Sequence, residues 1–171
     1  MPSFDLSEYL ACPTCRGALV AESLQRRTCT SCRSSYTRND HGYWELMSSK
    51  RGAAIDIDST SEDYAQSQHS AYPRRFETYL KPYIKGIEAR AILDVGCGVG
   101  EEVGLMLDLG FDAIGADLPA LARFWLDAGN DQDHFVNCDA LELPFGDGAF
   151  DLVISQGVIE HIGTEDGHSK L

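Results

Sequence analysis

The chain has 171 residues and a formal net charge of −13, because 27 acidic side chains outnumber 14 basic ones. The excess is concentrated in residues 91–171, which contain two Lys or Arg and sixteen Asp or Glu. A surface that follows nucleic-acid phosphates needs clustered cations, so this composition disfavours a nucleic-acid partner for that part of the chain. No signal peptide, transmembrane run or targeting presequence opens the sequence, which favours a cytoplasmic protein with no membrane partner.

The first predicted element is a metal site built from two Cys-x-x-Cys pairs. The pairs are Cys12 with Cys15 and Cys29 with Cys32, thirteen residues apart. Two tight turns of this kind present four thiolates to one ion, and four soft ligands with no open position favour structural Zn²⁺. Two disulfides or a redox-active Cys-x-x-Cys are the alternatives. The remaining cysteines, Cys97 and Cys138, have no disulfide-like spacing, and the reducing compartment that this indicates favours metal binding.

The residues around these cysteines resemble small zinc ribbons. The resemblance rests on Tyr9-Leu-Ala-Cys-Pro-Thr-Cys-Arg-Gly-Ala-Leu19, on the second cysteine pair and on the segment from Tyr36 to Met47. Together they resemble the Trm112-like zinc-ribbon domains, which partner or precede methyltransferases. They also resemble the ribbon of the large-subunit ribosomal RNA guanine methyltransferases, which has a His where this chain has Cys32. Residues 1–47 are therefore expected to form a zinc ribbon, whose arginines are the cations through which an RNA would dock.

A linker and an amphipathic helix are predicted next. Residues 48–63 are polar, rich in Ser and Asp and without periodicity, which is typical of a linker. Residues 72–88 carry apolar side chains at helical spacing, with Pro73 placed to begin a helix and Pro82 placed to kink or end it. This stripe is expected to pack on a sheet, and substrate contact by one of its tyrosines is the alternative. The candidates for that contact are Tyr64, Tyr72 and Tyr79.

Residues 92–100, Ile-Leu-Asp-Val-Gly-Cys-Gly-Val-Gly, predict a buried strand that turns into a helix through three glycines. Glycine lets a backbone approach a ligand, and a doubly wound parallel sheet presents a nucleotide-type ligand at such a turn. Glu101 and Glu102 open the following helix and would repel a phosphate there. The expected ligand is therefore a nucleoside without phosphates, and S-adenosylmethionine fits this description.

Three more strands are predicted after this helix. They are residues 111–117, 135–139 and 150–155. The alternation of strands and helices predicts an α/β fold, with a Rossmann-like, doubly wound parallel sheet of about four strands in residues 64–171 and the small ribbon before it. Asp117 ends the second strand, where a carboxylate accepts hydrogen bonds from ribose hydroxyls.

The segments ILDVGCGVG, IGAD and CDALELPFGDGAFDLVISQGVIEHI resemble, in this order, the class I S-adenosylmethionine-dependent methyltransferases over residues 85–165. The resemblance implies a role in the cofactor site for each matching residue. Asp94, Gly96 and Gly98 would line the methionine end, Asp117 would hold the ribose, Asp139 would meet the adenine amino group beside the Ala140 backbone, and Gln156 would face cofactor or substrate. Taken singly, Asp94 and Asp139 have simpler interpretations as acceptors of backbone hydrogen bonds in turns or helix caps.

Glu160 and His161 follow the fourth strand and are the candidate catalytic pair. His161 would act as a base if the acceptor must lose a proton, with Glu160 orienting it. A histidine that caps the next helix or faces solvent is the alternative. In the quinone-biosynthesis O-methyltransferases, which this pair resembles, an upstream Glu completes a metal site. Gly157 stands at that position here, which argues against a catalytic metal.

The number of strands sets the last expectation. The class I sheet has more strands than this sequence supplies, so residues 150–155 would leave an unpaired apolar edge. We expect either a fragment or a sheet completed by a partner or a second copy. The favoured function is methyl transfer to a small-molecule or protein acceptor rather than RNA. The alternative is a non-catalytic half-domain whose ribbon binds a partner methyltransferase. The final Ser-Lys-Leu matches a peroxisomal address, which is accidental if the chain is a fragment.

Overall fold

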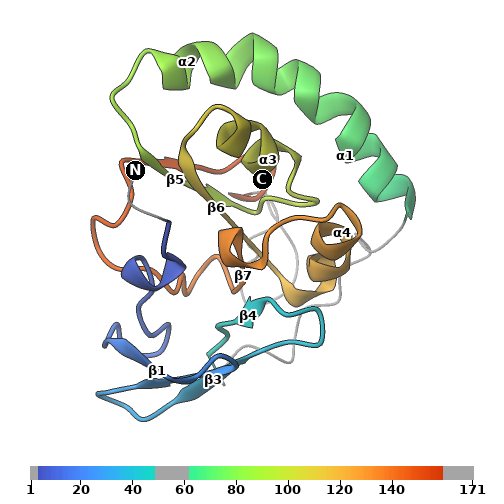
Figure 1. The fold of residues 1–171 in the computed structure, drawn as a ribbon. Helices are drawn as coiled ribbons and strands as arrows, with labels where there is room; N and C mark the ends of the chain where they lie inside the picture. Colours follow the sequence, from blue (N-terminus) through green and yellow to red (C-terminus); the bar gives the residue numbers. More distant parts are fainter. Residues whose placement is uncertain (1–3, 49–61, 160–171) are drawn as a thin grey trace.

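The structure is a computed structural model of the chain, and it describes residues 4–48 and 62–159. Their strands form one eight-stranded sheet in the order β1-β2-β3-β4-β7-β6-β5-β8 (Figure 1). Strands β1 to β4 pair antiparallel with one another, whereas β4 to β8 pair parallel. The predicted fold class is confirmed: a Rossmann-like parallel half follows a small N-terminal β unit.

The N-terminal unit is a short antiparallel ribbon that follows a single 3-10 turn at Leu6–Glu8. Its strands are β1 (Leu19–Ser23), β2 (Arg26–Cys29), β3 (Ser35–Arg38) and β4 (Trp44–Glu45). Most side chains of β1 are exposed, whereas Cys29, Tyr36 and Trp44 are buried. Strands this short do not enclose a core of their own, so the ribbon depends on what its buried side chains pack against.

The ribbon joins the parallel sheet through a direct strand pairing. β4 lies parallel to β7 (Phe135–Asn137), with Trp44 opposite Val136. The Leu46 amide then donates to the Asn137 carbonyl oxygen at 2.8 Å, which continues the ladder beyond the end of β4. Backbone pairing of this kind makes one continuous sheet from the two units (Figure 1).

The parallel half consists of β7, β6 (Asp112–Asp117), β5 (Ala91–Val95) and β8 (Leu152–Ile154). All residues of β5 are buried, as expected for a strand that is covered on both faces. Of these four strands β5 comes first in the chain, yet it lies between β6 and β8 in the sheet. The order of strands therefore reverses on either side of it. In doubly wound sheets, ligands bind beyond the carboxyl ends of the strands at such a reversal.

Helices cover one face of the parallel half (Figure 1). They are α1 (Glu62–Arg75), a π-helical stretch (Phe76–Leu80), α2 (Lys81–Lys85), α3 (Glu101–Asp108), a 3-10 turn (Pro119–Leu121) and α4 (Ala122–Asp127), whereas the 3-10 turn Gln132–His134 precedes β7 and has no buried residue. Their buried side chains share one core with the sheet. It includes Phe76, Ile84, Ile92, Val103 and Trp125. This layer therefore fixes α3, and the turn before it, against the sheet.

The first helix begins earlier than the sequence predicted. α1 begins at Glu62, so Pro73 lies inside it rather than in its first turn, and Pro82 lies in the first turn of α2. The π-helical stretch lies between these two prolines, each of which removes one backbone donor from the helical ladder. The helix was predicted to kink or end at Pro82. Instead, the structure has a π-helical stretch before Pro82, and a short α-helix begins at Lys81.

The apolar stripe of this helix is only partly buried, which corrects the expectation that all of it packs on the sheet. Phe76 and Ile84 are buried, but Tyr79 is 75% exposed and Tyr83 is 59% exposed. The wider π-helical turn rotates the following residues relative to a regular 3.6-residue stripe. Tyr72 is half-buried, and the side chain of Tyr64 lies outside the described residues.

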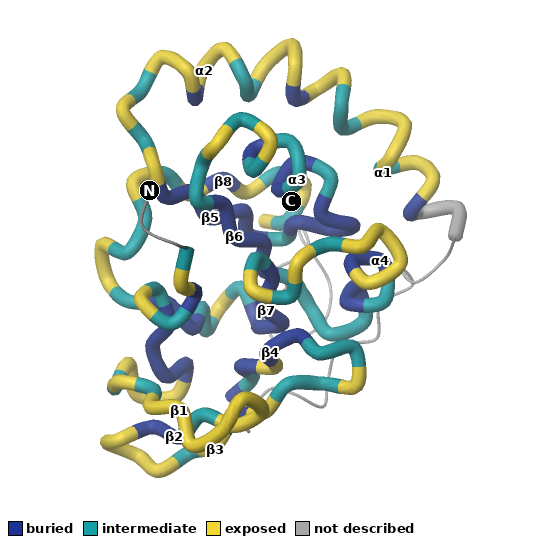
Figure 2. The backbone as a smooth tube through the Cα atoms, in the orientation of Figure 1, coloured by how far each residue is buried: buried dark blue, intermediate teal, exposed yellow. Residues whose placement is uncertain are grey.

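The ribbon covers the opposite face of the parallel half, where Figure 2 shows buried strands between the two layers. The shared core on this face includes Leu93, Ile114 and Val136 of the parallel strands together with Tyr36 and Leu46 of the ribbon. Residues 9–11 also bond to the loop 144–146 through two backbone hydrogen bonds of 2.8 Å. The ribbon therefore occupies the position of a second covering layer.

Strand β8 forms the edge of the sheet in the part of the chain that the structure describes. Val153 is 56% exposed there, although its neighbour in register on β5, Leu93, is 1% exposed. The apolar edge that the sequence predicted is therefore present in these residues. Within residues 4–48 and 62–159, no helix combines the length and the apolar composition that crossing a membrane requires.

Candidate functional site

A glycine turn follows β5 at the carboxyl edge of the sheet. Gly96, Gly98 and Gly100 have φ values of 77°, 56° and 86°, which L side chains rarely adopt. A Cβ at Gly96 would overlap Val158, and one at Gly100 would lie 2.7 Å from the Phe135 ring. The turn therefore requires glycine for backbone conformation and for space, as expected at a ligand-binding strand–helix turn.

Asp117, at the end of β6, lies against this turn. Its Oδ2 accepts a hydrogen bond from the Gly98 amide and its Oδ1 accepts one from the Leu118 amide, both at 2.7 Å. Burial raises the pKa of Asp117 to about 6, and the two amide hydrogen bonds act in the opposite direction. Each carboxylate oxygen retains further acceptor capacity. The arrangement suits a diol at the place predicted for the ribose.

Two other buried carboxyl groups, Asp94 and Glu102, lie at this edge. Asp94 is 4% exposed and Glu102 is 2% exposed. Burial, together with the charges of Glu102 and Asp117, raises the pKa of Asp94 to about 8. Burial also raises the pKa of Glu102 to about 7, against the opposing charge of Arg75. These groups favour a positively charged ligand, because a cation stabilises their ionised forms.

Glu102 is a site residue that the sequence analysis did not place here. Its Oε2 accepts a hydrogen bond from Gln156 Nε2 at 2.6 Å, and Gln156 Oε1 accepts one from Arg75 Nη2 at 2.7 Å. Among the described residues, the buried Oε1 of Glu102 has no hydrogen-bond partner. The helical spacing of apolar residues could have indicated that Glu102 is buried, because it shares the buried face of α3 with Val103 and Met106. Arg75 gave no signal, because it is 81 residues from Gln156.

Asp139 and Ala140 follow β7, beside the end of β6. Asp139 Oδ1 accepts a hydrogen bond from the Leu141 amide at 2.8 Å, and its carbonyl oxygen accepts one from the Glu142 amide at 2.9 Å. Asp139 thus stabilises a turn, which is the simpler of the two sequence interpretations. Ala140 is half-buried. Contact of either residue with an adenine ring stays a prediction.

Several sequence predictions lie outside the described residues. These are the catalytic pair Glu160 and His161, the final Ser-Lys-Leu and most of the expected linker. The roles of Glu160 and His161 therefore stay predictions. Gln156, which precedes them, is described and lies just beyond the end of β8, as predicted.

The four ribbon cysteines lie together, as the sequence predicted. Their Sγ atoms are all within 4.8 Å of one another. The Cys12–Cys32 sulfurs are 3.6 Å apart and the Cys15–Cys29 sulfurs are 3.5 Å apart. Tetrahedral zinc with its usual sulfur bonds separates sulfurs by about 3.8 Å, so the cluster fits that ion.

The two cysteine turns repeat one backbone geometry. The Arg16 amide donates to the Cys12 carbonyl oxygen at 2.8 Å, and the Arg33 amide donates to that of Cys29 at 3.1 Å. Both arginines are left-handed, with φ values of 65° and 64°, which is uncommon for residues other than glycine. The same strained, left-handed conformation at both turns indicates that both turns have one role. That role is to direct the two sulfurs of each pair toward a common point.

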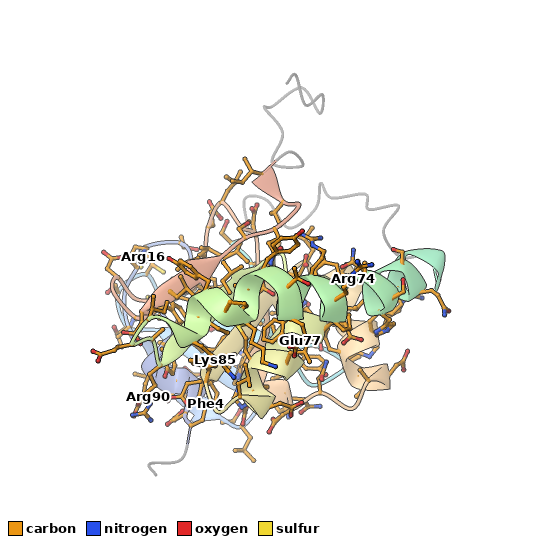
Figure 3. All side chains as sticks on the ribbon, turned by 90° about the horizontal axis from the view of Figure 1, so that it is seen from above. Phe4, Arg16, Arg74, Glu77, Lys85 and Arg90 are labelled. Carbon is orange, nitrogen blue, oxygen red and sulfur yellow. The ribbon has the colours of Figure 1, made fainter. Side chains whose placement is uncertain are left out.

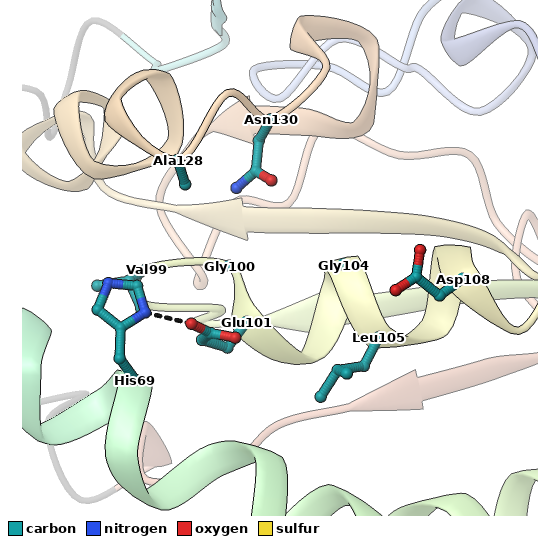
Figure 4. Close-up of a pocket in the computed structure, with 9 residues that line it drawn as sticks. All are labelled: His69, Val99, Gly100, Glu101, Gly104, Leu105, Asp108, Ala128 and Asn130. Carbon is teal, nitrogen blue, oxygen red and sulfur yellow. Dashed lines mark hydrogen bonds and ion pairs between the residues drawn. The ribbon is translucent and has the colours of Figure 1, made fainter.

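A separate cavity of about 280 Å³ lies among α1, α3 and α4 (Figure 4). His69 hydrogen-bonds to Glu101 at this cavity, and Gly104 and Asn130 also line it. Asp94, Gly98 and Asp117 do not line it. Val99 and Gly100 do line it, so the cavity lies between the helical layer and the last part of the glycine turn.

The buried carboxyls predict how the stability of the ligand-free protein depends on pH. Between its ordinary value of 3.8 and its raised value of about 8, Asp94 keeps its proton in the folded chain but loses it in the unfolded chain. The free energy of unfolding should therefore fall as pH rises, by at most about 1.4 kcal/mol per pH unit for this group. Denaturant titrations between about pH 5 and about pH 7 should show the fall, and Asp94→Asn should make it shallower, because only the contributions of Glu102 and Asp117 then remain.

Asp151→Asn is the matched control for this experiment. Backbone hydrogen bonds from Ala91 and Arg90 lower the pKa of Asp151, so this group is ionised in both states across the window. The control should keep the slope of the parent chain. A parent chain whose stability is constant or rises over this range would contradict the assignment of buried, protonated carboxyls.

Comparisons with known proteins find similarity to methyltransferases over part of the chain. The family described as "Methyltransferase domain" matches residues 93–170. The chain is 34% identical over 111 residues to tRNA (carboxymethyluridine(34)-5-O)-methyltransferase alkbh8 of Xenopus tropicalis. It is 40% identical over 87 residues to tRNA U34 carboxymethyltransferase of Shewanella halifaxensis. The matches cover 64% and 47% of this chain but 16% and 26% of those relatives, so the chain spans a minor part of their length.

A solved structure, the PH0226 protein from Pyrococcus horikoshii OT3, is 27% identical, with a TM-score of 0.37 over 57% of this chain and 44% of that chain. The family match includes the glycine turn, Asp117 and Asp139. Residues 93–170 are therefore similar to a methyltransferase domain, and the relatives that the chain resembles are methyltransferases by name.

Proposed function

We propose that this chain forms the cofactor-binding half of an S-adenosylmethionine-dependent methyltransferase that acts on tRNA. The cofactor part rests on one observation, the Asp117 carboxylate held against the glycine turn by the amides of Gly98 and Leu118. A carboxylate with two acceptor oxygens thus lies beside a glycine-rich turn at the reversal of strand order. This is where doubly wound sheets bind nucleosides.

The charges of the site fit a cationic nucleoside better than a phosphorylated one. Glu101 and Glu102 occupy the first turn of α3, where a phosphate would otherwise bind. S-adenosylmethionine, when bound, supplies a methyl group activated by a positively charged sulfur. A positive charge at this edge would favour the ionised forms of the buried Asp94 and Glu102. Cofactor binding would therefore release protons from these two groups. The chain's part in the reaction is then mainly to hold and orient.

The acceptor is proposed from the relatives. Both names refer to tRNA and to position 34, one to carboxymethyluridine(34) and the other to U34. They do not support the preference for a small-molecule or protein acceptor that the acidic C-terminal part suggested. The cations that an RNA backbone needs lie elsewhere in the chain. Arg26 and Arg33 are exposed on the ribbon, and Figure 3 shows Arg74 on the outer helix α1.

The alternative, a non-catalytic half-domain whose ribbon binds a partner methyltransferase, agrees less well with the packing. β4 is already paired with β7 of the same chain. The buried side chains of the ribbon, Tyr36 and Leu46 among them, pack against the parallel strands. These contacts favour a ribbon that serves the methyltransferase domain of its own chain.

Calorimetric titration with S-adenosylhomocysteine, the demethylated cofactor, tests the site without knowledge of the acceptor. The parent chain should bind saturably, and Asp117→Asn should weaken binding on the order of 100-fold, because two charge-assisted hydrogen bonds are lost. Asp112→Asn is the matched control at the other end of β6, where Asp112 pairs with Arg90 on the surface. It should leave the affinity unchanged.

Labelled S-adenosylmethionine and a tRNA with carboxymethyluridine at position 34 then test the acceptor. Label in the RNA fraction supports the proposal, whereas label only in small molecules would exclude tRNA as the acceptor. A folded chain that binds no S-adenosylhomocysteine would sink the cofactor assignment itself.

The cysteine cluster is proposed as a structural zinc site. Four thiols at tetrahedral spacing, on two turns of matching geometry, leave no coordination position open for catalysis. Cys12 Sγ also lies 3.2 Å from the Tyr36 hydroxyl, which can donate a hydrogen bond to that sulfur when it is a metal-bound thiolate. Zinc would hold the two turns together and so stabilise the ribbon against the sheet.

Elemental analysis of the reduced, purified protein should find about one zinc per chain. Cys32→Ser should lower that content, because a hydroxyl is a far poorer ligand than a thiolate. Cys138→Ala, which removes a buried cysteine outside the cluster, should not lower it. Metal-free protein in the reduced state would contradict the zinc assignment.

A further inference from the structure

The turn between β3 and β4, residues 39–43, belongs to the ribbon but packs behind the cofactor edge. We propose that Asn39 and Tyr43 of this turn are positioning residues for the cofactor site, acting through Asn137 and Trp125. The inference rests on the proposed cofactor function. It means that contacts made by the ribbon increase the affinity of the site for the cofactor. It is carried by two separate sets of contacts, one reaching Leu118 and the other reaching Gly98, the two residues whose amides bond to Asp117.

The first set begins at Asn39. Its Nδ2 donates to Asn137 Oδ1 at 2.8 Å. Asn137 is fully buried on β7, and its own Nδ2 donates to the Leu118 carbonyl oxygen at 3.1 Å and lies 3.4 Å from that of Asp117. Asn39 therefore fixes the side-chain orientation of Asn137, and Asn137 fixes the backbone just after β6.

The second set begins at Tyr43. Its fully buried ring meets the Trp125 ring edge-on, at 5.2 Å between centroids and an interplanar angle of 84°. Trp125 Nε1 donates to the Gly98 carbonyl oxygen at 2.8 Å. The Tyr43 hydroxyl donates to the Asn130 carbonyl oxygen at 3.2 Å, which anchors the ring just beyond α4. Tyr43 therefore supports the indole that holds the glycine turn.

The two sets converge on the residues that hold Asp117. Gly98 and Leu118 supply the amides that bond to the Asp117 carboxylate. The carbonyl groups of the same two residues accept hydrogen bonds from Trp125 and Asn137. Both donors to the proposed ribose acceptor are thus fixed from behind by side chains that contact the ribbon. Preorganised hydrogen-bond donors of this kind contribute to affinity because they need no ordering on binding.

The turn is itself held rigidly. Asn39 Oδ1 accepts hydrogen bonds from the amides of His41 and Tyr43, at 3.0 Å and 3.1 Å. Gly42 has a φ of 87° and leaves no room for a Cβ beside Gln132, whose Nε2 donates to the His41 carbonyl oxygen at 2.9 Å. Hydrogen bonds within the turn and to the segment before β7 therefore fix the positions of Asn39 and Tyr43 relative to the site.

Asn39→Asp is the sharpest test, because it keeps the size and the turn-forming oxygen but removes the donor to Asn137. Gln25→Glu adds the same charge at an exposed position of the ribbon and serves as the control. Tyr43→Leu tests the second set of contacts. Amide hydrogen exchange of Gly98 and Leu118 is measured in ligand-free protein, with the Ile84 amide of α2 as a distant reference, and S-adenosylhomocysteine affinity is measured by calorimetry.

Asn39→Asp and Tyr43→Leu should each speed exchange at Gly98 or Leu118, and weaken S-adenosylhomocysteine binding, by about tenfold, the effect of one lost hydrogen bond. Exchange at Ile84 and all values for Gln25→Glu should match the parent. Unchanged exchange at both site amides, or an equal rise at Ile84, would overturn the proposal. If the parent chain binds no S-adenosylhomocysteine, the cofactor function fails, while the exchange comparison still decides whether the ribbon positions these residues.

Discussion

The parallel pairing of β4 with β7 is the interaction on which the rest of the structure depends. It joins a ribbon too small to enclose a core to a parallel sheet that would otherwise have one uncovered face. Once β4 is in register, Leu46 continues the ladder and the buried side of the ribbon packs across β5, β6 and β7. The cysteine cluster then lies at the far end of a core that is continuous with the site-bearing strands.

The same pairing gives the candidate site support from both faces of the sheet. The helical layer holds α3 and the glycine turn from one side, through buried residues such as Val103 and Trp125. The ribbon reaches the ends of β6 and β7 from the other side, through Asn39. Between them lie carboxyls whose pKa values are raised by burial. A cationic cofactor would supply that charge, which links binding, protonation and stability in a single group of residues.

Local patterns in the sequence predicted the local structure well. The glycine turn, the parallel strands and the cysteine cluster all follow from short motifs whose backbone or ligand requirements are specific. Contacts between distant segments were not predictable, because single-sequence periodicity carries no information on them. Asn39 and Asn137 are 98 residues apart, and nothing in either segment indicates the other. The exposure of Tyr79 was also missed, because a π-helical stretch shifts the register that regular helical spacing assumes.

Because the ribbon and the parallel half share one continuous sheet, we expect them to fold as one unit. The chain has two tryptophans, Trp44 in β4 and Trp125 in α4. In a Trp125→Phe variant with its metal bound, fluorescence reports the ribbon, whereas far-ultraviolet circular dichroism reports the α-helices, which in the described residues all belong to the other half. If the two halves fold as one unit, both signals change at the same denaturant concentration. Loss of the Trp44 signal while the helices remain folded would contradict it.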